Sequence, residues 1–375
     1  MRFLFYTHSL VSDWNHGNAH FLRGIMRALN ARGHRTLALE PEDGWSRRNL
    51  IADRGPAALA EFEAAFPDLR WQGYGAGFDH EAALDRADVV VVHEWTDPAL
   101  VARIGAHRRQ GGRHRLLFHD THHRAVSAGD QIAAMELDGY DAVLAFGEAL
   151  RERYLAAGWG RQVHTWHEAA DTTVFHPIPE LLPQSDLIWV GNWGDDERSA
   201  ELEQFLITPA ETLRLSTTVH GVRYPDQALD RLCEAGIDYR GGLANAQVPR
   251  AFARHRVTVH VPRRPYVQAL PGIPTIRPFE ALACGLPLVS APWDDCEGLF
   301  RPGDMRFARD TIQMCHHLKE LLHDPDAAAE QARQGLRTIL DRHSCDHRAD
   351  QLLGILAGLG ATQPGAPRAP REAVA

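Results

Sequence analysis

Lysine is almost absent from this sequence. Lys319 is the only lysine among its 40 lysine and arginine residues. A phosphate loop of the Walker type needs a lysine directly after its second glycine, and Lys319 does not stand in that context, so ATP hydrolysis of that kind is excluded. A Schiff-base mechanism would need an amine in an apolar pocket, whereas the neighbours of Lys319 are polar, which argues against pyridoxal chemistry. Any phosphate must be bound by arginine or by backbone groups.

Cysteine is scarce, and long hydrophobic runs are missing. The 5 cysteines are odd in number and are never spaced as Cys-x-x-Cys, which argues against a disulfide framework and a zinc ribbon. The pair His316-His317 and the stretch 343–347 match no zinc spacing either, and we expect both at the surface without metal. The apolar run at 3–6 is too short for a signal-peptide core, and no run approaches a membrane span. We therefore expect a cytoplasmic protein without a membrane span.

Basic charge is in deficit, whereas apolar residues are plentiful. The 49 acidic residues outnumber the 40 basic ones and give a formal net charge of -9, which argues against a general nucleic-acid binder. The 375 residues, of which 44% are hydrophobic, suffice for two domains with large cores.

Short apolar segments alternate with segments of helical periodicity along the chain. Short apolar runs without strict alternation are typical of strands buried on both faces, and their alternation with helices predicts doubly wound parallel sheets. The expected strands of the first half are 3–6, 36–39, 89–92, 116–118, 142–146 and 163–166, with helices at 19–32, 98–110 and 148–157. The expected strands of the second half are 187–190, 217–219, 237–239, 257–261 and 288–290.

A proline-rich stretch divides these two series. Three prolines between His176 and Asp186 discourage both helix and central strand, so we place the linker there. The predicted fold class is α/β, with two Rossmann-like domains facing each other across a cleft. The predicted divisions are an N-terminal acceptor domain at 1–178, a C-terminal donor domain at 179–345, a closing helix at 346–360 and a disordered tail at 361–375.

The strongest local pattern lies at residues 272–290 and indicates a loop, a helix of about two turns and a strand. Pro278 suits the first helical position and Gly285 suits the left-handed residue after the helix. The open N-terminus of that helix, with Arg277, predicts a diphosphate site, and Glu280 could accept ribose hydroxyls. The alternative is that Glu280 is only a favourable first-turn acid and Arg277 a solvated side chain.

The run from Phe279 to Pro287 resembles the donor-nucleotide helix of GT-B glycosyltransferases. The preceding Thr275-Ile276-Arg277 resembles the CgeB-like group of spore-protein glycosyltransferases. The stretches 12–18, 171–177 and 190–193 resemble further segments of that group in the same order, so the resemblance covers roughly residues 1 to 345. It implies a metal-independent, hexosyltransferase-type enzyme with no cofactor, whose substrates are a nucleoside-diphosphate sugar and an unidentified acceptor.

The sequence departs from that pattern at two places. Retaining enzymes of the glycogen-synthase type have a second Glu eight residues before the helix Glu, and Gly272 stands there, so the stereochemical outcome stays open. The Lys-Gly expected shortly after 190–193 is also missing. We expect Arg223 to replace that cation, rather than the more solvated Arg198. The donor-binding residues expected from the resemblance are Gly191, Asn192, Arg223, Thr275, Arg277 and Glu280.

Polar residues end several strands of the first half, at the edge where open α/β sheets bind ligands. Asp120 is the preferred candidate for a base toward an acceptor hydroxyl, and His119 could serve or orient it. With 22 histidines in the chain, a surface or capping role for His119 is an equal alternative. His93 and Glu94 are the second choice. The acceptor or cleft loop is expected to contain His16, Gly17 and Asn18, although Asn18 could simply cap the next helix.

Two other functions stay open at this point. A nucleotide-sugar epimerase uses the same architecture and needs no acceptor. The missing carboxylate at Gly272 also allows a protein that binds a nucleotide or sugar without turnover. The identity of the base, the sugar and the acceptor and the oligomeric state are not indicated by the sequence.

Overall fold

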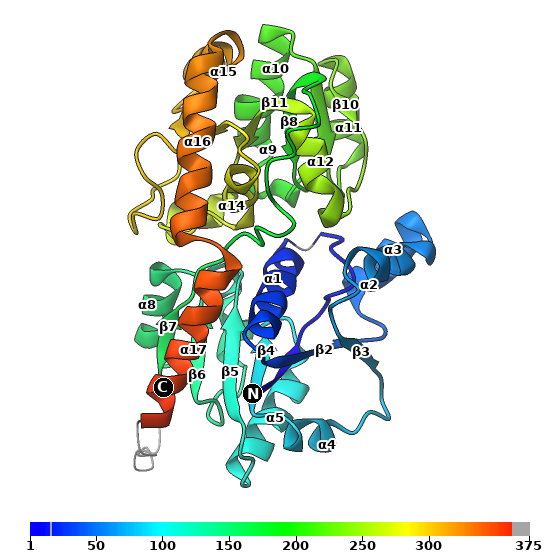
Figure 1. Cartoon of the computed structure of the whole chain (residues 1–375), viewed down its shortest axis with the longest axis vertical. Helices are drawn as coiled ribbons and strands as arrows, with labels where there is room; N and C mark the ends of the chain where they lie inside the picture. Colours follow the sequence, from blue (N-terminus) through cyan, green and yellow to red (C-terminus); the bar gives the residue numbers. More distant parts are fainter. Residues whose placement is uncertain (16, 362–375) are drawn as a thin grey trace.

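The protein is described by a computed structural model that covers residues 1–15 and 17–361, and two parallel sheets organise it (Figure 1). The first sheet has seven strands in the order β3-β2-β1-β4-β5-β6-β7, which is a doubly wound arrangement. Its strands are β1 (Arg2–Tyr6), β2 (Arg35–Pro41), β3 (Trp71–Tyr74), β4 (Val89–His93), β5 (Arg115–Asp120), β6 (Ala142–Ala145) and β7 (Val163–Thr165).

Helices cover both faces of the first sheet. Strand β4, Val-Val-Val-Val-His, is buried along its whole length because apolar side chains pack against it from both sides. The helices are α1 (Asn18–Ala31), α2 (Trp45–Arg54), α3 (Ala57–Ala65), α4 (His80–Asp85), α5 (Pro98–Arg109), α6 (Arg124–Ser127), α7 (Gly129–Ala133) and α8 (Glu148–Ala157).

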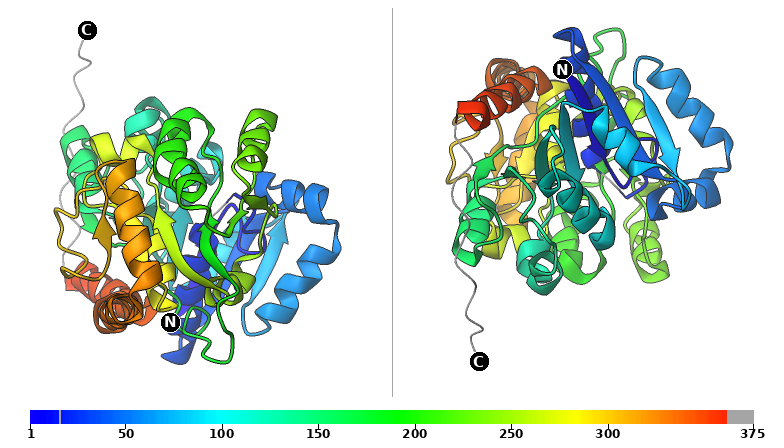
Figure 2. Two further views of the ribbon diagram at one scale, coloured as in Figure 1. Left: turned by 90° about the horizontal axis from the view of Figure 1, so that it is seen from above. Right: turned by 90° about the horizontal axis from the view of Figure 1, so that it is seen from below.

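The second sheet has six strands in the order β10-β9-β8-β11-β12-β13. Its strands are β8 (Ser185–Val190), β9 (Thr217–His220), β10 (Asp238–Tyr239), β11 (His255–His260), β12 (Leu288–Ser290) and β13 (Arg306–Phe307). Its helical segments are η1 (Asp195–Glu197), α9 (Ser199–Leu202), η2 (Glu203–Ile207), α10 (Thr208–Leu213), α11 (Asp226–Glu234), η3 (Asn245–Gln247), α12 (Val248–Ala253), α13 (Arg264–Ala269), α14 (Ile276–Ala283), α15 (Thr311–His323) and α16 (Pro325–Arg342). The end-on views in Figure 2 place α2 and α3, in blue, at one margin and α16, in orange, at the opposite one.

The last described helix, α17 (Cys345–Ala361), returns from the second domain to the first and packs along α1 (Figure 1). Its Leu352 belongs to the same apolar cluster as Phe21 and Ile25 of α1. The helices approach so closely at Gly24 that an added Cβ would collide with the sulfur of Cys345. This helix lies where a closing helix was expected, and most of the predicted tail, residues 362–375, lies outside the described part of the chain.

The predicted fold class is confirmed, and each strand expected from the sequence is present within one or two residues of its predicted bounds. Two short edge strands, β3 and β13, were not predicted. The prediction that Pro278 begins its helix was wrong, because α14 begins at Ile276. Pro278 is tolerated as the third helical residue, since an N–H in the first turn has no acceptor within the helix. None of the described helices is long and apolar enough to cross a membrane.

Candidate functional site

A pocket lies between the domains, where the carboxyl ends of strands from both sheets meet. Its unfilled space, counted together with the open solvent at its mouth, is about 620 Å³. The first domain lines it with the loop after β1 and with α2, and the second with the ends of β8, β9 and β10 and with the start of α14. The lining residues are Asp13, Trp14, Asn15, Gly17, Leu50, Arg54, Val190, Gly191, Asn192, Gly221, Val222, Gly242, Leu243, Asn245, Val248 and Arg277.

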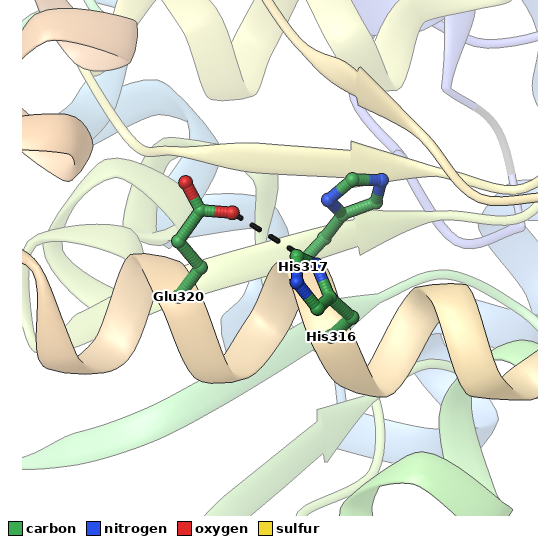
Figure 3. Close-up of side chains that lie close together, drawn as sticks. All are labelled: His316, His317 and Glu320. Atoms are coloured by element: carbon green, nitrogen blue, oxygen red, sulfur yellow. Dashed lines mark ion pairs between the residues drawn. The ribbon is translucent and has the colours of Figure 1, made fainter.

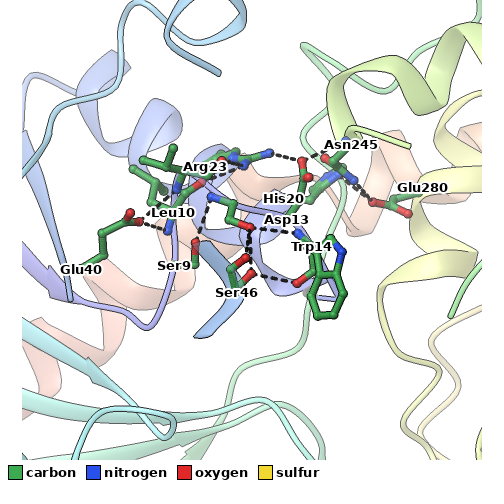
Figure 4. Close-up of polar contacts among 12 residues, drawn as sticks. Ser9, Leu10, Asp13, Trp14, His20, Arg23, Glu40, Ser46, Asn245 and Glu280 are labelled. Atoms are coloured by element: carbon green, nitrogen blue, oxygen red, sulfur yellow. Dashed lines mark hydrogen bonds and ion pairs between the residues drawn. The ribbon is translucent and has the colours of Figure 1, made fainter. Parts of the chain in front are cut away.

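The loop after β1 is held in place by two buried charged side chains (Figure 4). Arg23 of α1 is 2% exposed, and its guanidinium donates to the carbonyl of Leu10 at 2.7 Å and to Asp13 Oδ2 at 3.1 Å. Glu40 at the end of β2 accepts the backbone N–H of Leu10 at 2.7 Å and that of Val11 at 3.1 Å. Because a buried charge must be paired, these contacts fix the loop that lines one side of the pocket.

Polar contacts join the two domains beside this pocket. Asp13 accepts the backbone N–H of Asn245 at 2.9 Å, and Asn15 accepts a hydrogen bond from the side chain of Asn192. Nδ1 of His20, on α1, lies 2.9 Å from Oε1 of Glu280, on α14. Nε2 of the same ring accepts the backbone N–H of Asp171 at 2.8 Å, so the ring proton is assigned to Nδ1, which faces Glu280.

Two helix N-termini converge at the pocket. Neither α1 nor α14 has a hydrogen bond from a side-chain cap, and Gly17, before α1, approaches Ile276, at the start of α14, so closely that an added Cβ would lie 2.9 Å from Ile276 Cγ2. Thr275, before α14, has φ 61° and ψ −176°, a region that is almost restricted to glycine. The free N–H groups and the helix dipoles make this junction favourable for an anion.

Arg277 lines the pocket as expected, but Glu280 does not face it. The Glu280 side chain is fully buried, accepts a hydrogen bond from Asn245 Nδ2 at 2.9 Å and forms an ion pair with Arg277. Burial works to raise the pKa of Glu280, but Arg277, His20 and Asn245 outweigh it and hold the pKa below its usual value. Both oxygens therefore have protein partners, and the structure favours a role in holding Arg277 over the expected contact with ribose hydroxyls.

The expected order of Arg223 and Arg198 is reversed. Arg223 has φ 61°, its side chain is 40% exposed, and its guanidinium pairs with Asp195 at 2.8 Å instead of lining the pocket. Arg198 is the less solvated of the two, because its guanidinium donates to the carbonyls of Val261, at 3.0 Å, and of Asn192. Burial, then Arg263 and Arg277, lower the pKa of Arg198 to about 9. Arg263 is already paired with Glu197 at 2.9 Å.

The acceptor-side candidates lie together at the ends of β4 and β5, but they are buried. Asp120 is fully buried and accepts hydrogen bonds from the hydroxyl of Tyr154 at 2.7 Å and from the backbone N–H of His122 at 3.0 Å. Burial raises the pKa of Asp120 to about 6, against the effect of these bonds. Because both oxygens are occupied, the geometry argues against Asp120 as the base toward an acceptor.

The other three candidates of this group are also enclosed. His119 packs on Trp166 with ring centroids 4.8 Å apart, and burial lowers its pKa to about 3, so the ring is neutral near pH 7. His93 Nε2 lies 3.1 Å from the hydroxyl of Thr121. Glu94 pairs with Arg124 at 2.7 Å, and burial, together with Asp120, raises the pKa of Glu94 well above its usual value.

In the cleft loop, Asn18 is the first residue of α1 and not its cap, and Gly17 lines the pocket. His16 lies outside the described residues. Sequence reasoning did not single out Asp13, Glu168 and Glu297. These residues interact with groups more than 100 positions away, so no local motif marks them.

The histidine pair lies on α15 (Figure 3), and α15 is at the end of the second domain that is remote from the first domain (Figure 1). His316, His317 and Glu320 have ligand atoms within 4.8 Å of one another. Arg306 already pairs with Glu320, with one N–O distance of 2.9 Å, and this cation opposes a metal ion at the same carboxylate.

Comparisons with known proteins agree on the fold. Residues 198–354 match the sequence model of a family described as "Glycosyl transferase-like". No curated protein shows a significant sequence match. A sucrose-phosphate synthase from Thermosynechococcus elongatus has TM-score 0.65 and 13% identity over 96% of this chain and 99% of its own. HepE from Anabaena, in complex with UDP-glucose, has TM-score 0.67 and 13% identity over 96% and 100%. An α-glucosyltransferase in complex with UDP has TM-score 0.69 and 10% identity over 95% and 100%.

The two facing parallel-sheet domains are thus those of the GT-B fold. Within that fold, residues 198–354 are similar to the glycosyl transferase-like family.

Proposed function

We propose that this protein transfers a sugar from a nucleoside-diphosphate-sugar donor, with the diphosphate at the junction of α1 and α14 and the nucleoside in the interdomain pocket. The observation that carries the proposal is the convergence of two helix N-termini without side-chain caps, together with Arg277, on a pocket lined by Gly191 and Asn192. Free N–H groups and helix dipoles bind phosphate, and a guanidinium adds a planar grip on its oxygens.

The proposed chemistry is stabilisation of the leaving diphosphate. Negative charge grows on the oxygen that leaves the sugar, and preorganised donors at that oxygen lower the barrier. Arg277 lines the pocket, and it lies close enough to Arg198 to lower the pKa of that guanidinium. We propose that these groups carry the charge without a metal ion, and that removing one of them costs about 10² to 10³ in kcat.

Uridine is the first choice for the nucleoside, because HepE was solved with UDP-glucose and the α-glucosyltransferase with UDP. We further propose membership in the CgeB-like group, which rests on the resemblance of residues 12–18 and 275–277. The division into acceptor and donor domains is proposed at 178–179, a point that falls between β7 and β8. The acceptor is placed over the carboxyl edge of the first sheet, and its base is not assigned to Asp120.

A thermal-shift panel of UDP-, dTDP-, GDP- and ADP-glucose tests the donor site. A ligand at 100 times its Kd adds about 2.7 kcal/mol to the stability of the protein. We expect one of these sugars to raise Tm, Arg277→Gln to lose that rise, and Arg333→Gln to keep it. Arg333 is a matched control, because it lies exposed on α16, away from the pocket lining, and pairs with the exposed Glu330. A wild-type protein whose Tm responds to none of the four refutes the proposal.

Turnover distinguishes the remaining alternatives. Release of nucleoside diphosphate that depends on an added acceptor supports transfer. Conversion of the donor sugar without any acceptor would favour the epimerase alternative. Binding of the donor without turnover over a broad panel of acceptors would favour a protein that binds nucleotide sugars only.

A further inference from the structure

Glu168 is a buried acid that none of the contacts described so far uses. It follows β7, in the segment where the chain leaves the first sheet at the edge facing the second domain, and it is 5% exposed. No hydrogen bond to its carboxyl is found among the described residues, and burial and nearby charges alone act on it. Burying a carboxyl without a partner is costly, so such a group is a candidate for ligand contact.

The backbone around Glu168 is fixed on both sides. The carbonyl of His167 accepts a hydrogen bond from Arg348 at 3.0 Å, and the His167 ring lies 2.6 Å from Glu297. On the other side, the N–H of Asp171 is bound by His20. Glu168 is therefore held in place by its neighbours, while its own carboxyl has no bond among the described residues.

The other carboxylate in this region is already paired. Glu297 lies against Gly272, where an added Cβ would come 2.6 Å from its Oε1. The same Oε1 accepts the backbone N–H of Glu148 at 2.8 Å, and the other oxygen faces His167. Glu297 thus joins the domains with both oxygens, so Glu168 is the acid of this region that has bonding capacity left.

Four titratable side chains lie near enough to Glu168 for electrostatic interaction. Arg277 and Glu280 of α14 act on Glu168 from the second domain, and Glu168 acts on Tyr266 of α13 and on Cys345 of α17. Because Arg277 lines the pocket, Glu168 lies near the proposed diphosphate site. A second anion would be repelled by Glu280 at this position, whereas a neutral hydroxyl would not.

We propose that Glu168 is a further donor-site residue, whose carboxyl hydrogen-bonds a hydroxyl of the sugar attached to the diphosphate at Arg277. This inference rests on the proposed function. It assigns to Glu168 the contact with the sugar for which no carboxylate is present at position 272. Sugar hydroxyls both donate and accept, so one hydroxyl can satisfy a buried carboxyl that has no protein partner.

The protonation state follows from the surroundings. Burial, and then the charge of Glu280, raise the pKa of Glu168 to about 8, although Arg277 acts in the opposite direction. Below that pH the carboxyl keeps its proton and offers an O–H donor to the sugar. As the pH rises through about 8 the proton is lost, and the carboxylate then accepts a charge-assisted hydrogen bond from the sugar hydroxyl, which is stronger than the neutral one. The contact is therefore expected to strengthen in alkaline solution.

Calorimetric titration of the full chain with UDP and with UDP-glucose tests the contact. We expect Glu168→Ala to bind UDP-glucose about tenfold more weakly and to leave UDP binding unchanged, because only the sugar touches this residue. The inference is overturned if Glu168→Ala binds both ligands more weakly by the same factor, or if it binds both as tightly as the wild type. A wild-type chain that binds neither ligand would instead count against uridine as the donor base. The titration would then be repeated with the nucleotide sugar that raises Tm in the thermal-shift panel and with the corresponding nucleoside diphosphate.

A pH series separates the contact from a structural effect and remains decisive if Glu168→Ala does not fold. The amide of Glu168→Gln mimics the protonated acid and has no proton to lose. We expect wild-type affinity for UDP-glucose, relative to UDP, to rise between pH 7 and 9, and that of Glu168→Gln to stay constant within about twofold. The same rise in both proteins, or no rise in the wild type, overturns the inference.

Discussion

The contact between His20 and Glu280 gives the sharpest test of how the two domains are joined. The two atoms lie 2.9 Å apart, and the side chains are 1% and 0% exposed. His20→Ala removes the ring on the first domain. Glu280→Ala removes the carboxylate on the second domain. Each variant alone breaks the contact, and the double variant shows whether the two costs are shared.

The expected magnitude follows from the burial of both groups. The His20 ring donates from Nδ1 to the Glu280 carboxylate, and a hydrogen bond to a charged group contributes about 1.5 to 3 kcal/mol. His20→Ala leaves Glu280 with Arg277 and Asn245, so we expect a loss of about 2 kcal/mol. Glu280→Ala deprives Arg277 of its counter-charge and should cost more, about 3 to 5 kcal/mol. The double variant should cost less than the sum by about 1 to 3 kcal/mol.

Urea unfolding measures these costs. Tryptophan fluorescence and far-UV circular dichroism should be recorded together, because two domains need not unfold in one step. The control cycle pairs His20→Ala with Arg333→Ala on the exposed side of α16, and its costs should add within about 0.5 kcal/mol. If the His20 and Glu280 variants also add within about 0.5 kcal/mol, the contact does not join the domains in solution, and the reasoning is refuted.

Two further outcomes follow from the site. Thr275→Gly should raise the free energy of unfolding, measured by urea unfolding, by about 1 kcal/mol, because glycine relieves a conformation that costs other residues about 1 to 3 kcal/mol. Thr275→Ala is the control and should show no such gain. Burial raises the pKa of Asp120 to about 6, above the usual value of 3.8, so its ionisation destabilises the fold as the pH rises from about 4 to 6. Asp120→Asn still accepts the Tyr154 hydroxyl and should remove that decline while keeping donor turnover. Loss of turnover with an intact fold would restore Asp120 as a catalytic candidate.

Most of the fold could be predicted from local patterns. Strand β4 is four consecutive valines before a histidine, and α8 begins at Glu148 and ends just before the left-handed Gly158. Such signals depend on neighbours in sequence, so one chain suffices to see them. The missed strand β3 contains a glycine and is only partly buried, and β13 has two residues, so neither shows the apolar run on which the prediction relied.

The site was predicted less completely, for a physical reason. The helix around Arg277 was found because its loop, helix and strand are adjacent in sequence. The partners of Glu280 were not found, since His20 and Asn245 reach it from distant segments. The reversal of Arg198 and Arg223 has the same cause. The solvation of a guanidinium depends on the carbonyls around it, and the carbonyl of Val261, which bonds Arg198, lies after a strand that is distant in sequence.

The polar contacts between the domains couple closure of the cleft to assembly of the donor site. Glu280 positions Arg277 within the second domain and contacts His20 on the first, and Asp13 joins Arg23 to Asn245 in the same way. Separating the domains would break both contacts at once and free Glu280 and Asp13 to rearrange. The groups proposed to hold the diphosphate are then complete only when the domains are together and water is excluded, which is the condition under which a donor sugar is protected from hydrolysis.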